Sequence, residues 1–492
     1  MKQLLAIFLI TISLSLFTDN SIFANSSDVI SLNEVVSEGG DNSEHHLPSA
    51  WSVIPFAVLL IMIATGPLFY EHFWHKNYPK VAILLAIIVV GYYLFILHNT
   101  HGPVHALFEY FQFIALLSSL YIASGGILIE IDKKGKPLIN VILLFIGAII
   151  SNIIGTTGAS MLLIRPFIRL NKSRIKPYHI IFFIFMVSNI GGSLTPIGDP
   201  PLFLGFLKGV PFSWTLTHNF VPWIFTILLF CVIFYFYDSR NKEINPLFAD
   251  EQENYTQKIK ITGAKNFLWL GVVIAAVFLD PNVKGFEWVP SIPYDGQNFS
   301  FVREMIMFFV AYMSFKFASQ DAIKGNEFNF EPIREVAFIF VGIFGTMMPA
   351  LELVAGFAAS EAGKELISHN TLYWGTGFLS GFLDNAPTYL NFLTAAIAAQ
   401  GGSISVKADV VNFAYGDGGF TNSIIQLTAI SVGAVFFGAM TYIGNGPNFM
   451  VKSIAEQIGI QMPSFFGYII RFSLPILLPI LFIVWLIFFA FI

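Results

Sequence analysis

Two aspartates lie in interrupted apolar stretches of this chain. Asp199 belongs to a Gly- and Pro-rich run at residues 195–203, and Asp384 stands beside an Asn and near a Pro at residues 384–388. Ionisable side chains inside apolar spans are costly and usually functional. Burial favours the protonated acid and a bound cation favours the carboxylate, so one site holds H⁺ or Na⁺ but not both. This pattern predicts ion exchange, with capping of a broken helix as the alternative role for each aspartate.

Hydroxyl and amide side chains near the same breaks add oxygen ligands. We expect an ion- or substrate-binding site built from both aspartates together with Asn152, Thr156, Thr157, Thr195, Asn385, Thr388, Thr441, Asn445 and Asn448. The expected Na⁺ ligands are Asp199, Asp384 and Asn385. Half-helix N-termini at the same turns would favour an anionic substrate. The residues therefore support two classes of substrate, a cation and a small carboxylate or oxyanion.

Composition indicates which elements carry these residues. Of 492 residues, 12% are charged and 55% are hydrophobic, and the mean hydropathy is +0.70. A soluble domain carries roughly twice that charge, so a soluble enzyme, a disordered chain and a nucleic-acid binder are excluded. The chain has no phosphate-binding loop and no catalytic motif, which argues against an ATP-driven pump and against an enzyme. We expect a membrane transporter, with no cofactor beyond a transported or coupling Na⁺.

Apolar stretches predict an all-α polytopic membrane protein of about 10 transmembrane helices. Two further stretches, 137–164 and 371–398, are too short to cross a membrane twice. Basic residues flank the first of them on both sides, which places both of its ends in the cytoplasm. We therefore predict two re-entrant hairpins that enter from opposite faces. Their turns, near Gly155 and Asp384, are site candidates because non-helical backbone at membrane depth must be enclosed by protein or line a cavity.

An inverted repeat relates the two halves of the chain. Residues 195–203 and 441–449 both read T-x-I-G-[D/N]-x-P-x-F, and each run follows a predicted hairpin. Paired broken segments of this kind indicate a binding site at the centre of a secondary transporter. The predicted order is a signal peptide (or an uncleaved first helix) at 1–24, a polar extracytoplasmic tail at 25–50, N-terminal spans at 51–104, the first repeat at 105–215, connecting spans and a cytoplasmic linker at 216–334, the second repeat at 335–460 and a C-terminal span at 461–492.

Two motifs resemble those of the ion transporter superfamily. Residues 189–199 are similar to the N-x-G-G-x-x-[S/T]-P-I-G-D stretch of NhaD-type sodium/proton antiporters, and residues 383–388 are similar to their L-D-N-x-P motif. The first hairpin departs from that pattern, because Ser151-Asn152 stands where those antiporters have D-N, and this pair is closer to the citrate carriers. The resemblance implies opposed hairpins, elevator-like movement, a homodimer, and site roles for Asp199, Asp384, Asn385 and Thr388.

The residues and the resemblance together favour a sodium/proton antiporter in the bilayer of a bacterial inner membrane. The alternative is Na⁺- or H⁺-coupled transport of citrate or another small carboxylate. The expected partners are the small ion or carboxylate and the lipid bilayer, without nucleic acid.

Overall fold

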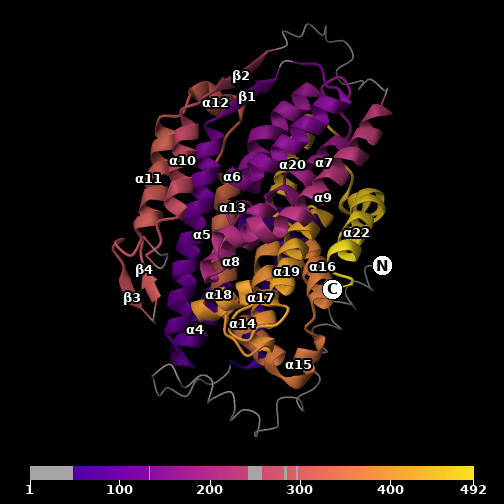
Figure 1. Ribbon diagram of the computed structural model, residues 1–492. Helices are drawn as coiled ribbons and strands as arrows, with labels where there is room; N and C mark the ends of the chain where they lie inside the picture. Colours follow the sequence, from indigo (N-terminus) through magenta and orange to yellow (C-terminus); the bar gives the residue numbers. More distant parts are fainter. Residues whose placement is uncertain (1–47, 132, 242–257, 282–284, 295–296, 492) are drawn as a thin grey trace.

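The computed structural model describes residues 48–131, 133–241, 258–281, 285–294 and 297–491. The predicted signal peptide at 1–24, most of the polar tail at 25–50 and part of the linker lie outside these residues. The described chain is a bundle of long apolar helices (Figure 1). Eight of its helices are long and apolar enough to cross a membrane, or nine if the bent pair Glu331–Thr346 and Met348–Ala359 is one span. The all-α polytopic architecture is confirmed, whereas the number of spans stays a prediction.

The first half of the chain forms long helices interrupted by short 3₁₀ turns. Its elements are η1 Ala50–Val53, α3 Ile54–Phe69, α4 Glu71–Phe95, α5 His101–Gly125, β1 Leu128–Ile131, α6 Pro137–Leu170, α7 Pro177–Met186, η2 Ile190–Leu194, α8 Pro200–Lys208 and α9 Phe212–Ser239. Proline stands in the first turn of α6, α7 and α8. Its missing N–H costs nothing there, because the first N–H groups of a helix have no partner within the helix.

The second half contains more and shorter helices. Its elements are β2 Ile259–Thr262, α10 Asn266–Val277, β3 Ile292–Tyr294, β4 Gln297–Phe299, α11 Val302–Lys316, α12 Gln320–Gly325, α13 Glu331–Thr346, α14 Met348–Ala359, α15 Glu361–Leu366, α16 His369–Phe382, α17 Asn385–Ala399, α18 Lys407–Tyr415, α19 Ser423–Phe437, η4 Gly438–Met440, α20 Gly446–Gln457, α21 Phe465–Tyr468, η5 Ile469–Leu477 and α22 Leu478–Phe488. Strands β1 and β2 pair antiparallel, as do β3 and β4. The two small sheets lie toward opposite ends of the molecule (Figure 1).

Helix α6 is a hairpin whose chain reverses at Gly155. This glycine has φ 79° and ψ 155°, and the residues on both sides of it are helical. At the two ends of α6, Asn140 and Asn171 exchange amide hydrogen bonds of 2.7 and 2.8 Å. In a straight helix these two residues would lie about 47 Å apart. The chain therefore turns at the predicted place, and entry of this hairpin into a membrane from one face stays a prediction.

Helices α16 and α17 form the second hairpin. The chain is extended at Leu383 and Asp384, between the two helices. Gly375 of α16 faces the ring of Phe392 in α17, and a Cβ on this glycine would lie 3.0 Å from the ring. In Figure 1 the second hairpin lies toward the end that carries α15, whereas β1 and β2 lie at the other end.

The basic loops lie at one end of the molecule, as the charge pattern predicts. Strand β1 pairs with β2 so that Leu128 lies opposite Thr262. This pairing places β1, which leads into the basic loop before α6, beside residues 259–262 at the described end of the linker. The loop after α6 joins them through Arg174, whose guanidinium lies 2.8 Å from Asp238 at the end of α9.

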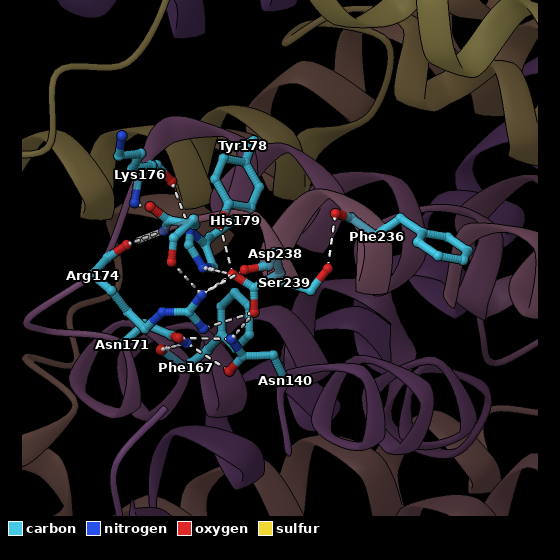
Figure 2. A network of polar contacts seen from close by, with 11 residues as sticks. Asn140, Phe167, Asn171, Arg174, Lys176, Tyr178, His179, Phe236, Asp238 and Ser239 are labelled. Atoms are coloured by element: carbon cyan, nitrogen blue, oxygen red, sulfur yellow. Dashed lines mark hydrogen bonds and ion pairs between the residues drawn. The ribbon is translucent and has the colours of Figure 1, made fainter. Parts of the chain in front are cut away.

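Asp238 is the centre of a buried polar cluster at the open end of the first hairpin (Figure 2). Its carboxylate is fully buried. It accepts hydrogen bonds from Tyr178 Oη at 2.6 Å, Arg174 Nη1 at 2.9 Å and Asn140 Nδ2 at 2.8 Å. One charge therefore connects the first arm of α6, the loop after α6, α7 and α9.

His179 completes the cluster in a defined tautomer. Its Nδ1 accepts a hydrogen bond from the backbone N–H of Lys176 at 3.1 Å, and its Nε2 lies 3.0 Å from Asp238. Since Nδ1 accepts, Nε2 carries the ring proton and donates it to the carboxylate. The imidazole thus caps the start of α7 and pairs with Asp238 at the same time.

We expect Asp238→Ala to lower the free energy of unfolding by about 3–5 kcal/mol, because the substitution leaves Arg174, whose side chain is only 13% exposed, without its counter-charge. Thermal unfolding of the detergent-purified protein measures this change. The matched control is Glu361→Ala, which removes an exposed ion pair with Lys364 and should have a much smaller effect. Equal losses for the two variants would contradict the role given to the cluster.

Candidate functional site

The two broken segments have the same local structure, as their shared sequence predicts. Thr195 Oγ1 donates to the carbonyl of Asn152 at 2.6 Å and accepts the N–H three residues later at 3.1 Å. Thr441 Oγ1 donates to the carbonyl of Gly381 at 2.7 Å and accepts the N–H three residues later at 3.1 Å. In each half, the threonine that begins the T-x-I-G-[D/N]-x-P-x-F motif therefore connects the broken segment to the preceding hairpin by a hydrogen bond.

Asp199 lies where the two halves meet. The residue is 0% exposed. Its Oδ1 accepts hydrogen bonds from Thr156 Oγ1 at 2.7 Å and from Asn445 Nδ2 at 2.9 Å, and its Oδ2 accepts one from Asn385 Nδ2 at 2.8 Å. Thr156 follows the turn of the first hairpin, Asn385 follows the turn of the second, and Asn445 precedes α20. One carboxylate thus contacts both hairpin turns and the second broken segment.

Several helix N-termini converge at this carboxylate. Asp199 immediately precedes α8, Asn445 immediately precedes α20, Asn385 is the first residue of α17, and Thr156 opens the second arm of α6. The N-terminus of a helix carries partial positive charge and unpaired N–H groups. These helix ends therefore favour negative charge at Asp199, whose three side-chain partners are neutral, and they would favour a carboxylate or another anion placed beside them.

A chain of three amides lies behind Asp199. The amide nitrogen of Asn445 also lies 3.2 Å from Asn189 Oδ1 and 3.1 Å from the carbonyl oxygen of Ser188. Asn189 Nδ2 in turn donates to Asn448 Oδ1 at 2.6 Å. The predicted residues Asn445 and Asn448 are thus connected through Asn189, which the sequence reasoning did not single out. Its one sequence signal is its place as the first residue of the motif at 189–199.

Asp384 has the local contact of a helix cap. Its Oδ1 accepts the backbone N–H of Ala386 at 3.0 Å, at the start of α17. Thr388 Oγ1 donates back to the carbonyl of Asp384 at 2.9 Å. These contacts agree with the capping alternative for Asp384, and its role in ion binding stays a prediction.

Two other predicted residues, Asn152 and Thr157, lie near the first turn without contacting Asp199. Asn152 Oδ1 accepts the N–H of Leu194 at 2.8 Å, and its Nδ2 donates to the carbonyl of Ala148 at 3.0 Å. This amide therefore joins the first hairpin to η2. Thr157 is half-buried and takes no part in the hydrogen bonds of Asp199.

Gly438 allows the amides to approach the centre of the site. A Cβ at this position would lie 3.0 Å from Asn189 Oδ1 and 3.2 Å from Asn385 Nδ2. Both contacts are shorter than ordinary van der Waals packing permits. The first residue of η4 must therefore be small for the second hairpin to reach Asp199.

Two opposed helical hairpins and two broken helices that meet at one buried carboxylate, inside an apolar helical bundle, define a secondary transporter. A family model described as "Putative citrate transport" matches residues 44–489. The chain therefore belongs to that family of membrane transporters, which is of the ion transporter type. No curated protein matches the chain at a significant level.

We expect Gly438→Ala to destabilise the protein by about 1–3 kcal/mol, because the added methyl group must displace a buried amide. Thermal unfolding measures the change. Gly271→Ala in α10 is the control, since a Cβ there meets nothing within 4 Å and alanine is the better helix former. Equal behaviour of the two variants would count against tight packing around Asp199.

Proposed function

We propose that this protein carries citrate or a related small carboxylate across the membrane, coupled to H⁺ or Na⁺ bound at Asp199. The observation that carries the proposal is the position of this buried carboxylate, between both hairpin turns and at the N-termini of α8, α17 and α20. Electropositive helix ends favour an anionic substrate. The family match supports citrate as the type of substrate.

Electrostatics supplies a reason for the coupling. An ionised Asp199 and an anionic substrate at the same helix N-termini would repel each other, and repulsion is strong where water is excluded. A proton or Na⁺ on Asp199 removes this repulsion, so the cation favours entry of the substrate. Each of the two carboxylate oxygens has two acceptor positions. Oδ1 has two side-chain donors and Oδ2 has one, which leaves a position on Oδ2 for the cation.

Movement of the site would require the hairpins and broken segments to shift against α5 and the segment before α13. Lys208, at the end of α8, pairs with Glu109 of α5 at 2.6 Å. Arg165, in the second arm of α6, pairs with Glu327 in the segment before α13 at 3.0 Å. Elevator-like movement of the hairpins would break both ion pairs. In this proposal the carrier is a homodimer in a bacterial inner membrane, as the resemblance implies.

Sodium/proton exchange, the leading prediction from the sequence, is the second candidate. The observation that favours it is the buried carboxylate of Asp199, whose side-chain hydrogen-bond partners are all neutral. Such a group can exchange H⁺ for Na⁺ without a carboxylate substrate. In this alternative the cation itself is the cargo.

A transport assay separates the two candidates. We expect purified protein in proteoliposomes to accumulate labelled citrate when an inward Na⁺ or H⁺ gradient is applied. Asp199→Asn should reduce uptake to background, because the amide keeps the shape of the side chain but has neither the negative charge that attracts Na⁺ nor a group that takes up H⁺.

Asp384→Asn tests the two roles predicted for Asp384. Asparagine caps helices as well as aspartate does, so a capping role alone leaves uptake within about tenfold of the wild type, whereas loss of uptake would make Asp384 an ion ligand. Proton efflux driven by Na⁺ without citrate, together with no citrate uptake, would reject the carboxylate proposal in favour of exchange. Normal uptake by a folded Asp199→Asn variant would remove Asp199 from the mechanism.

A further inference from the structure

We propose that Asn189 is a positioning residue that fixes the orientation of the Asn445 amide. By doing so it confines the coupling cation to the Oδ2 side of Asp199, next to Asn385. The inference rests on the proposed function and deepens it, because it assigns the cation to one oxygen of the carboxylate and gives a role to a residue outside the predicted site.

The orientation of the amide chain is set at Asn448. Its Nδ2 donates to the backbone carbonyls of Gly438 at 2.8 Å and Thr441 at 2.9 Å. Carbonyl oxygens only accept hydrogen bonds, so the NH₂ end of this side chain must face them. Its Oδ1 is therefore directed to Asn189.

Asn189 passes this orientation on to Asn445. Its Nδ2 donates to Asn448 Oδ1 at 2.6 Å and to the carbonyl of Ile184 at 2.8 Å, and both of these partners are acceptors. Its Oδ1 is thus left to accept from Asn445, whose Nδ2 lies 3.2 Å away. The neighbouring carbonyl of Ser188, 3.1 Å from the same nitrogen, is a second acceptor that holds the Asn445 amide in this orientation together with Asn189. Asn189, Asn445 and Asn448 are at most 2% exposed. Reversing one amide would oppose like groups away from water, which is costly.

The result is a donor, and not an oxygen ligand, on one side of Asp199. Asn445 Nδ2 donates to Oδ1 at 2.9 Å, and Thr156 Oγ1 donates to the same oxygen at 2.7 Å. Both acceptor positions of Oδ1 are then filled. A cation beside this oxygen would meet the N–H group of Asn445, and Thr156 would have to give up its hydrogen bond to Oδ1 to turn a lone pair toward the cation.

The opposite side of Asp199 is arranged differently. Oδ2 accepts from Asn385 Nδ2 at 2.8 Å, and Asn385 does not belong to the amide chain. Turning the Asn385 amide over would place Asn385 Oδ1 beside Asp199 Oδ2. These two oxygens could bind Na⁺ between them. Alternatively, a proton on Asp199 Oδ2 could donate a hydrogen bond to Asn385 Oδ1. Asn385 is therefore the ligand that changes with the cation, and Asn189 keeps the other side constant.

Two substitutions at one position test this role. Asn189→Leu removes both the acceptor for Asn445 and the donor to Asn448 with little change in volume. We expect a change of about fivefold or more in the half-saturating concentration of Na⁺ or citrate, with a smaller change in maximal rate. Asn189→Asp keeps the acceptor, but an ionised carboxylate cannot donate to Asn448.

The pH profile of Asn189→Asp separates positioning from packing. A protonated carboxyl group donates with one oxygen and accepts with the other, as the amide does. At each pH, the half-saturating concentrations of Asn189→Asp are compared with those of the wild type. The difference between the two proteins should become smaller as the pH falls. Asn189→Leu should remain altered at every pH. If the leucine variant does not fold, the aspartate variant alone carries the test.

Unchanged half-saturating concentrations in folded Asn189→Leu, or a defect of Asn189→Asp that does not depend on pH, would overturn the inference. Failure of the proposed function looks different, because the wild type itself would then take up no citrate, whether or not it exchanges Na⁺ for H⁺. In that case, the role of Asn189 can still be tested by measuring how the thermal stability of the purified protein depends on Na⁺ concentration. A Na⁺ midpoint that moves in Asn189→Leu supports the role of Asn189, and one that does not move refutes it.

Discussion

A buried carboxylate must have hydrogen-bond donors, and this requirement organises the centre of the molecule. Asp199 takes its donors from Thr156, Asn385 and Asn445. These residues come from two hairpins and a second broken segment that are far apart in the chain. Since an unpaired buried charge is very unfavourable, the hairpin turns and both breaks must meet at one point. The binding site and the contact between the repeats are therefore the same structure.

The rest of the bundle supports this meeting point. The Asp238 cluster closes the open end of the first hairpin through Asn140 and joins it to α7 and α9, at the end opposite the turn at Gly155. Gly438 leaves the space through which the amides reach Asp199. A transporter needs such rigid support because ligand geometry decides whether a site is productive. Each of these parts is distant from Asp199 in sequence, yet each limits where its donors can lie.

Local signals made part of this structure predictable. The T-x-I-G-[D/N]-x-P-x-F runs and the turns at Gly155 and Asp384 follow from residues that break helices or cap them, and such effects act within a few positions. The family match agrees with the transporter class, although its description names citrate transport and not the predicted sodium/proton exchange. The sequence predicts either a helix cap or an ion ligand at Asp384, and its contact with the backbone N–H of Ala386 is that of a cap.

Contacts between distant segments could not be predicted in the same way. Asn189 and Asp238 acquire their roles through partners such as Asn448 and Asn140, and no local pattern marks these pairs. The two small sheets were also unexpected, because β1 and β2 are four residues each and pair across a long stretch of chain. Pairing of this kind depends on how the helices pack and not on the strand residues themselves.

Infrared difference spectroscopy of the purified wild type and Asp199→Asn tests most directly that Asp199 binds the coupling cation. Adding Na⁺, or lowering the pH, should change a carboxyl or carboxylate stretching band in the wild type. We predict that this band is missing from the spectrum of the variant. Identical difference spectra for the two proteins would contradict the account, because the cation would then bind without Asp199.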